Sequence, residues 1–243
     1  MSIRLLLSIV FLISFTANAE SLILKNQYRH EIKQMAVDNH NPNHSYKQAR
    51  QFIMQRLDLR QDHEGFYVKD VYCHTKFRNK VGPGKMPNHT KINVEHTWPR
   101  SRFGGKAQFR MKEADLHHLF PSDSVANSTR GNHIFTQFPR QVQTEYGLSN
   151  CPTSKSGYYA SANSQAFEPP TDHKGNVARA LFYFAVRYDM KISNYEEFVL
   201  RQWNLLDPVD RDEILRNDAI ADIQGNRNPF VDDSELVEFI TDF

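Results

Sequence analysis

The sequence predicts an α+β fold in which a single, mostly helical domain carries a small sheet. The chain has 243 residues, about the length of one large domain, and contains neither an internal repeat nor a low-complexity linker. Hydrophobic residues make up 40% and charged residues 24%, as in folded soluble proteins. Apolar residues follow helical spacing towards both ends, whereas short extended runs lie in the middle.

Residues 1–19 differ from the rest and have the pattern of a secretory signal. Arg4 precedes an apolar run over residues 5–15, and residues 17–19 (Ala-Asn-Ala) form a small-x-small cleavage site. The run is short for a membrane span, and the alternative is an uncleaved anchor. We expect export to the periplasm or the medium, leaving a domain over residues 20–243 that does not associate with a membrane.

Two helices are expected at the start of this domain. Residues 21–37 carry apolar side chains at helical spacing, and residues 39–44 interrupt the pattern. Ser45 is expected to cap a second helix, with Gln48 completing a capping box. The side chains expected to face inwards from this second helix are Phe52, Ile53 and Leu57.

The middle of the chain is expected to contain short strands. Residues 65–77 are aromatic-rich and alternate, which indicates a strand, and residues 80–90 hold glycine and proline in a loop. Two further short strands are expected over residues 93–96 and 116–120.

A helix is expected directly after these strands. Ser122 or Asp123 can cap it, and the helix would carry Asn127. The order across residues 93–130 is therefore strand, loop, strand, helix.

The last third is expected to be helical after an irregular stretch. Residues 139–170 are polar and show no clear period. Residues 176–190 read as a helix packed with apolar side chains. Asn194 and Asp210 are each expected to cap a further helix, because a glutamate follows three residues later in both cases.

Cys73 and Cys151 are the only two cysteines. Export would place them in an oxidising compartment, where two thiols can pair. We expect a disulfide between them, and two free thiols are the alternative.

Charge is distributed unevenly along the chain. The formal charge of +2 falls to +1 when the segment with Arg4 is removed. Residues 78–112 nevertheless hold nine lysines or arginines against one acid, Glu95, whereas residues 204–243 hold eleven acids against three arginines. A solvated loop is the ordinary interpretation of such a run. Because its lone carboxylate adjoins a histidine, we favour an anionic substrate.

Three side chains near this basic stretch have complementary chemistry. Glu95 can hold a hard cation, and His96 can take up a proton near neutral pH. Asn127 offers a neutral oxygen ligand on the expected helix. A base, a metal and surrounding positive charge are what phosphodiester hydrolysis needs.

Four segments in order resemble the endonuclease I family of secreted or periplasmic bacterial nucleases. They are residues 95–99 (EHTWP), 115–119 (DLHHL), 127–132 (NSTRGN) and 224–230 (QGNRNPF), within a resemblance that runs from about residue 67 to 231. The resemblance implies a single domain whose small sheet bears a ββα-metal nuclease motif. It also implies that the last segment is structural.

The resemblance assigns roles to the central residues. It makes His96 the general base that activates a water and makes Glu95 and Asn127 the ligands of Mg²⁺, with Mn²⁺ or Ca²⁺ as alternatives. It implies an endonuclease that cuts DNA with little sequence preference and leaves 5′-phosphates. Whether RNA is also cut stays open, and we expect a monomer. One tension is that neighbours on a strand point to opposite faces, so the strand must end or kink near Trp98.

Other roles are less well fixed. Arg130 is the expected phosphate clamp by its position, with Arg100 and Arg102 as alternatives, because the connection from Arg100 to the second motif segment is shorter here than in some relatives. His117 is expected near the metal, with a packing role as the alternative.

Two rival functions remain open. A metal-dependent hydrolase of another substrate class, such as peptides, would also use Glu-His pairs, but no His-Glu-x-x-His stretch occurs. A secreted nucleic-acid-binding protein without catalysis would need the basic stretch alone.

Overall fold

The computed structural model describes residues 27–41, 44–106, 108–139 and 146–243. The expected signal segment, residues 1–19, lies outside them. Among the described residues, no helix is both long and apolar enough to cross a membrane.

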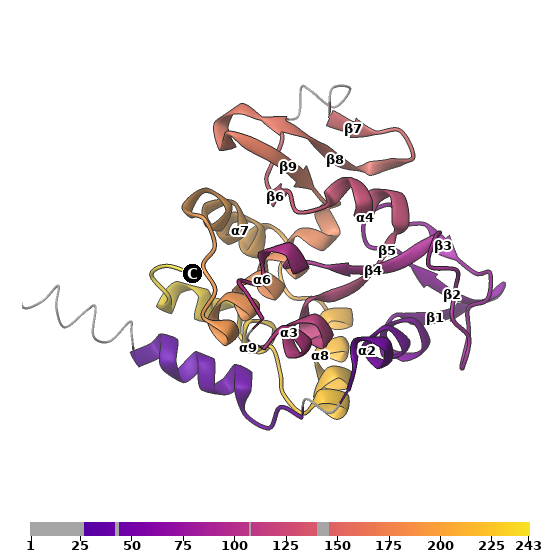
Figure 1. Ribbon diagram of the computed structural model, residues 1–243, viewed down its shortest axis with the longest axis horizontal. Helices are drawn as coiled ribbons and strands as arrows, with labels where there is room; N and C mark the ends of the chain where they lie inside the picture. Colours follow the sequence, from indigo (N-terminus) through magenta and orange to yellow (C-terminus); the bar gives the residue numbers. More distant parts are fainter. Residues whose placement is uncertain (1–26, 42–43, 107, 140–145) are drawn as a thin grey trace, which may run out of the picture.

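Helix α6 (Lys174–Tyr188) runs through the centre of the fold (Figure 1). Fourteen of its fifteen residues are buried, as expected for a helix covered on all sides. Helix α7 (Asn194–Leu206) packs along it, and the larger of two apolar clusters is built around this pair. The apolar run predicted over residues 176–190 is therefore the central helix.

The N-terminal part forms two helices. The first covers residues 27–37 of the expected 21–37, and the rest of that range lies outside the described residues. Helix α2 (Tyr46–Phe52) follows, with the predicted capping box between Ser45 and Gln48 in place. It continues as a π-helical turn over Ile53–Leu57, whose end residues are buried as predicted.

Capping residues also determine where the C-terminal helices begin. Asp210 accepts a hydrogen bond from the Glu213 backbone N–H and starts α8 (Arg211–Gln224), as predicted. Helix α7 begins one residue earlier than expected, because Ser193, not Asn194, is its N-cap. The short helix α9 (Pro229–Asp232) and a 3₁₀ segment (Ser234–Phe239) complete the chain.

A three-stranded antiparallel sheet lies at one end of the molecule. It consists of β1 (Leu59–Asp62), β2 (Gly65–Lys69) and β3 (Lys76–Phe77). The single strand expected over residues 65–77 is wrong in length. The Asp70 carboxylate accepts hydrogen bonds from three following backbone N–H groups, those of Tyr72, Cys73 and Thr75. These bonds hold a turn that divides the run into two strands.

A second sheet covers the opposite side of α6 from the N-terminal helices (Figure 1). Its strands pair in the order β6-β9-β8-β7, and their ranges are β6 (Ile134–Phe135), β7 (Gly147–Leu148), β8 (Cys151–Tyr159) and β9 (Ser164–Glu168). The expectation that residues 139–170 are irregular is therefore wrong. Strand β8 is only partly buried, so its side chains do not show the alternation by which half-buried strands are recognised.

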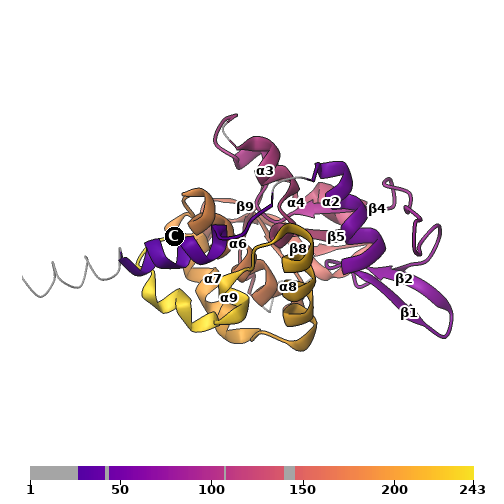
Figure 2. The same cartoon turned by 90° about the horizontal axis from the view of Figure 1, so that it is seen from below.

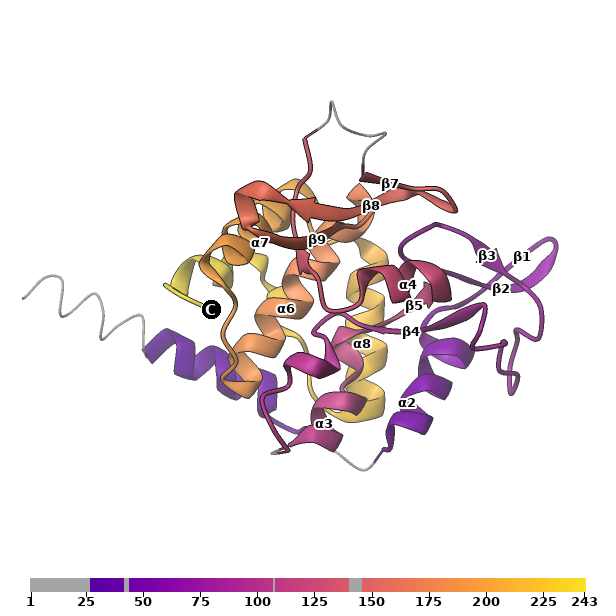
Figure 3. The same cartoon turned by 45° about the horizontal axis from the view of Figure 1, so that its top comes forward.

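The predicted strand, loop, strand and helix lie between these parts. Strands β4 (Ile92–His96) and β5 (Leu119–Asp123) form an antiparallel pair, and α4 (Ser124–Arg130) packs on one face. Figure 3 shows α4 between this pair and β8. Helices α2 and α8 lie on the other side, as Figure 2 shows from below. The α+β, mostly helical fold predicted from the sequence is confirmed.

A disulfide joins two of the sheets. Cys73, in the turn after β2, is bonded to Cys151 at the start of β8, across 78 residues of sequence. The expected pairing of the two cysteines is confirmed.

Candidate active site at the end of strand β4

The backbone of the candidate site is the β4–β5 pair. Glu95 pairs with Phe120, and His96 pairs with Leu119 at the last position of β4. The strand therefore ends at His96, as the expected break near Trp98 requires. Asp123 ends β5 and caps α4 by accepting hydrogen bonds from Val125 and Ala126.

Glu95 is buried on the face of β4 that α4 covers. Its Oε1 atom accepts a hydrogen bond from the Tyr72 hydroxyl at 2.9 Å and forms an ion pair with Arg130 Nη1 at 2.9 Å. Burial raises the pKa of Glu95 to about 6, while Arg130 and the Tyr72 hydrogen bond act in the opposite direction. No hydrogen bond from a described residue reaches Oε2, so this oxygen is available to a ligand.

Asn127 faces the same side of β4 from α4. Its Nδ2 donates to Asn93 Oδ1 at 2.8 Å, and Asn93 shares a strand face with Glu95 because it lies two residues before it. This bond leaves Asn127 Oδ1 without a hydrogen-bond donor among the described residues. Asn127 is partly exposed, so solvent reaches this side of the site.

These two oxygens fit a hard cation. A carboxylate oxygen and an amide oxygen are ligands that Mg²⁺ takes, and Mg²⁺ keeps several waters beside such protein ligands. Within the described ranges, no group of three or more His, Cys, Asp or Glu is placed to hold a metal. Glu95 and Asn127 therefore present one carboxylate oxygen and one amide oxygen on the same side of β4, and their role as metal ligands stays a prediction.

His96 points to the other face of β4. Its ring packs against Tyr46 of α2, with centroids 5.0 Å apart, and against His118 at 5.4 Å. Its Nε2 lies 3.0 Å from the carbonyl oxygen of Glu113. A carbonyl only accepts, so Nε2 carries the proton and Nδ1 holds the free lone pair.

The environment of His96 keeps the ring neutral. Burial and the neighbouring His118 hold the pKa of His96 well below its ordinary value, although the Glu113 carbonyl opposes this. A neutral imidazole with a fixed tautomer can accept a proton at Nδ1.

Glu95 and His96 are neighbours in sequence, but their side chains lie on opposite faces of β4. Glu95 contacts Tyr72 and α4, whereas His96 contacts α2 and the segment before β5. Strand β4 pairs only with β5 in its two-stranded sheet, so its other edge carries no strand in the described chain.

Arg130 is not placed as the phosphate clamp that the sequence suggested. Its side chain is 1% exposed and lies over the Phe135 ring. Its guanidinium donates to the carbonyls of His96 at 3.1 Å and Thr97 at 2.6 Å and pairs with Glu95. Because protein acceptors occupy it, Arg130 instead fixes the end of β4.

The other two arginines differ in availability. Arg102 pairs with Glu196 at 3.2 Å and donates to the Asn132 carbonyl at 2.8 Å. Arg100 pairs with Glu113 at 2.7 Å, and 51% of its side chain is exposed. Glu113 is the residue whose carbonyl holds His96, so Arg100 is the better-placed of the two for a phosphate near the base.

The two neighbouring histidines are not on a strand. Residues 116–118 form a 3₁₀ turn, because the Asp115 carboxylate accepts the His117 backbone N–H. The strand expected over residues 116–120 begins only at Leu119. His117 packs on Tyr183 and bonds to the Asn226 carbonyl, whereas His118 lies against His96. The placement favours the packing role for His117 over the metal-side role.

Four contributing residues were missed from the sequence. Asn93 could have been found, because alternation along a strand places it on the face of Glu95. Tyr46, Tyr72 and Glu113 reach the site from separate elements, and no pattern in the sequence signals those contacts.

The 224–230 segment is structural, as expected from the resemblance. Gln224 accepts the Leu116 backbone N–H and donates to the Asp115 carboxylate, which places the start of the 3₁₀ turn. Asn226 donates to the Ala36 carbonyl and to the Tyr183 hydroxyl.

Comparisons with known proteins agree on one family. The family model described as Endonuclease I matches residues 21–235. An extracellular ribonuclease of Bacillus amyloliquefaciens is 37% identical over 168 residues, which cover 61% of this chain and 53% of the relative. A periplasmic deoxyribonuclease of Aeromonas hydrophila is 30% identical over 167 residues, with 62% and 67% covered. An endonuclease-1 of Buchnera aphidicola is 28% identical over 157 residues, with 58% and 61% covered. The chain spans about half the length of the extracellular ribonucleases that it matches.

Proposed function

Because the chain belongs to the endonuclease I family, we propose that it is a Mg²⁺-dependent endonuclease that hydrolyses phosphodiester bonds of DNA with little dependence on sequence. One observation carries this proposal. His96, with a fixed tautomer, and Glu95, with a free carboxylate oxygen, occupy the last two positions of β4, and α4 brings the free amide oxygen of Asn127 to the Glu95 face.

The substrate range is proposed to include RNA. Relatives named as deoxyribonucleases and relatives named as ribonucleases both match this chain. Recognition through the phosphate backbone would serve both, and binding should then weaken steeply with salt. The products are expected to carry 5′-phosphates.

Glu95 Oε2 and Asn127 Oδ1 would hold the ion. Bound there, Mg²⁺ would supply positive charge that stabilises the phosphate oxygens and the leaving 3′-oxygen as negative charge develops. Mn²⁺ and Ca²⁺ have overlapping oxygen preferences and are the alternative ions. Tyr72 and Arg130 hold Glu95 by its other oxygen, which leaves Oε2 without a competing bond from a described residue.

His96 would take a proton from the attacking water at Nδ1. The Glu113 carbonyl orients the ring through Nε2, and burial keeps the ring neutral, so that Nδ1 retains the lone pair that accepts the proton. Arg100, exposed beside Glu113, is placed to bind the phosphate after cleavage, because its guanidinium binds oxygens in pairs.

We further propose that the protein acts after export and as a monomer. The Cys73–Cys151 bond is the kind of crosslink that persists in oxidising compartments. The matched relatives include extracellular and periplasmic nucleases.

The first test is plasmid digestion by residues 20–243 with Mg²⁺ and with EDTA. His96→Ala is expected to reduce the cleavage rate by about 10²–10⁴, because it removes the general base. His63→Ala is the matched control, because His63 is exposed in the turn between β1 and β2. Undiminished cutting by the His96 variant would remove the proposed mechanism, and DNA binding without any wild-type cutting would favour the binding-protein alternative.

The second test addresses the metal. Glu95→Gln is expected to raise the Mg²⁺ concentration required for half-maximal cleavage, because it removes the charged ligand while keeping the shape of the side chain. Glu238→Gln is the control, since Glu238 is exposed near the end of the chain. An unchanged Mg²⁺ requirement in the Glu95 variant would exclude this residue as a ligand.

A further inference from the structure

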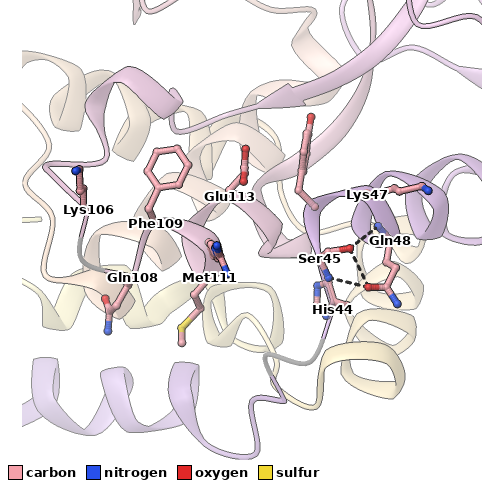
Figure 4. A pocket seen from close by; sticks show the side chains of 11 residues that line it. His44, Ser45, Lys47, Gln48, Lys106, Gln108, Phe109, Met111 and Glu113 are labelled. Atoms are coloured by element: carbon pink, nitrogen blue, oxygen red, sulfur yellow. Dashed lines mark hydrogen bonds between the residues drawn. The ribbon is translucent and has the colours of Figure 1, made fainter.

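A large groove opens beside His96, between α2 and α3 (Phe109–Ala114). Its volume is about 1070 Å³. Figure 4 shows the side chains that line it, with Ser45 and Lys47 on the α2 side and Phe109 and Glu113 on the α3 side; the Lys47 side chain extends away from α3, at the rim of the groove. The groove adjoins the candidate base, because Tyr46 and Glu113 both line it and both contact His96.

The groove carries positive charge that the described residues do not neutralise. Lys47, Lys106 and Arg110 line it and are exposed, and none of their side chains forms an ion pair or hydrogen bond with a described residue. The one carboxylate in the lining, Glu113, is paired with Arg100 at 2.7 Å. An anionic occupant is therefore favoured.

The groove also presents aromatic surface next to this charge. Phe109 is half-buried, and its inner edge packs against Phe103 with centroids 5.4 Å apart. The Arg100 guanidinium lies 5.6 Å from the Phe109 ring centre and 6.0 Å from that of Tyr46. The surface beside His96 thus combines the Arg100 guanidinium with two aromatic rings.

Cations interleaved with aromatic faces suit an unpaired nucleotide strand more than a duplex. In a single strand each base offers a free face that can stack on a ring, and the backbone offers phosphates to lysine and arginine. In a duplex the base faces are already stacked, so a partly exposed ring such as Phe109 can reach only their edges.

We infer that the α2–α3 groove binds an unpaired stretch of nucleic acid next to the phosphate to be cut. Phosphates lie against Lys47 and Arg110, and a base stacks on Phe109. This inference rests on the proposed nuclease function, because it takes His96 as the general base that the bound nucleic-acid strand reaches. It makes locally melted or single-stranded nucleic acid the preferred substrate.

The test measures binding separately from cleavage. The His96→Ala protein is titrated in EDTA against a fluorescently labelled single-stranded DNA and against the same strand annealed to its complement. Phe109→Leu in this background is expected to weaken single-strand binding by about 5- to 100-fold, because the variant cannot stack on a base. Its effect on duplex binding is expected to be several-fold smaller.

Two further variants control for structural effects. Phe109→Tyr keeps the aromatic face and should bind the single strand as the parent does. Lys47→Ala combined with Arg110→Ala should lower the slope of log affinity against log salt by about 0.7 for each phosphate that the variant no longer neutralises. Lys191→Ala, which removes an exposed lysine at the end of α6, should leave that slope unchanged.

The outcomes separate this inference from the nuclease proposal. Equal weakening of single-strand and duplex binding with Phe109→Leu, or failure of Phe109→Tyr to restore binding, would overturn the groove assignment. So would absence of single-strand binding by the parent protein. If wild-type protein does not cut in Mg²⁺ while these binding differences appear, the nuclease proposal fails and the groove assignment stands. An RNA strand in the same titration shows whether the 2′-hydroxyl matters.

Discussion

The guanidinium of Arg130 donates to the backbone carbonyls of His96 and Thr97 and pairs with the Glu95 carboxylate. One side chain thus binds the candidate metal ligand, the backbone of the candidate base at the end of the strand and the backbone of the residue after it. Only a planar group with several donors in fixed directions can serve all three acceptors at once. We therefore assign Arg130 a positioning role.

Arg130→Lys is expected to lower the free energy of unfolding by about 2–4 kcal/mol, because an ammonium leaves part of this buried acceptor set unpaired. Urea denaturation followed by circular dichroism measures the change. Arg102→Lys is the matched control and should cost less than about 1 kcal/mol, since that arginine is partly exposed and its pair is screened. Equal stabilities for the two variants would contradict the positioning role.

At the residue scale, the sequence singled out Glu95, His96 and Asn127 as candidates because their residue types have complementary chemistry, and their roles stay predictions. It could not show that Arg130 is buried, because an arginine three residues after Asn127 on a helix can point to solvent or to the core. It also favoured His117 over His118 as the histidine near the metal, whereas His118 is the one that lies against His96. The Asp115 turn that orients them depends on contacts with Tyr183, Tyr188 and Gln224, which are far away in sequence.

At the scale of elements, α4 depends on its first turn. The helix has seven residues, too few to be stable by its own hydrogen bonds. The Asp123 carboxylate satisfies two backbone N–H groups at its start, and packing on β4 and β5 provides the rest. Because α4 carries Asn127, this cap also sets where the amide of this candidate ligand lies.

Asp123→Ala is expected to lower the free energy of unfolding by about 1 kcal/mol, the usual value of an N-cap. Asp123→Asn keeps an oxygen acceptor and should restore most of that stability. Denaturation midpoints of the three proteins measure the difference. A cap effect would be excluded if the alanine and asparagine variants were equally stable.

The sequence predicted the first residues of helices better than it predicted the strands. Ser45, Asp123 and Asp210 act through hydrogen bonds to backbone groups two or three residues away, so the signal lies within a few residues. The β8–β9 pair was missed because its register depends on contacts between separate segments, and its polar residues lack a clear period. The split of residues 65–77 was missed because one aspartate, Asp70, makes the turn.

At the scale of the whole molecule, the disulfide ties the sheet that holds Tyr72 to the sheet that covers α4. The backbone carbonyl of Tyr72 also accepts hydrogen bonds from Thr153 and Ser154 of β8, beside the crosslink. The Tyr72 hydroxyl in turn holds Glu95. The crosslink therefore stabilises both the fold and the support of the candidate metal ligand.

Replacing Cys73 and Cys151 by serine is expected to lower the free energy of unfolding by about 2–5 kcal/mol, because the unfolded chain gains freedom. Thermal unfolding of the double variant measures this decrease. Wild-type protein unfolded in the presence of a reductant should show a similar decrease in melting temperature. Unchanged unfolding of the variant would show that the crosslink adds nothing to stability.

Stability should also depend on pH through buried histidines. Burial lowers the pKa of His117 and His118 to about 4 and that of His173 to about 3, with nearby arginines adding to the effect. Above about pH 6.5 these rings are neutral in both the folded and the unfolded chain. Between about pH 6.5 and 4 the unfolded chain binds their protons and the folded chain does not. Stability therefore falls as pH falls through this window.

The expected slope is about 1.4 kcal/mol per pH unit for each such histidine. Urea midpoints measured across the window test this. His173→Phe should flatten the dependence, because His173 lies among the rings of Tyr72 and Phe120 and its Nε2 has no partner in the described structure. Midpoints that stay constant between neutral pH and about pH 4.5 would contradict the assignment of these rings as buried and neutral.

The contacts of Gln224 have a consequence for the growing chain, because the ribosome makes Gln224 late. A growing chain contains Glu95, His96 and Asn127 long before Gln224 is made. Until then the buried Asp115 lacks its amide partner, and Leu116, which leads into β5, lacks its acceptor. Chains stalled on the ribosome before Gln224 should therefore not cut nucleic acid, whereas released full-length chains should, which a cleavage assay on purified stalled complexes can measure. On this view, the proposed nuclease activity begins only after synthesis, when the chain has been released from the ribosome that made it.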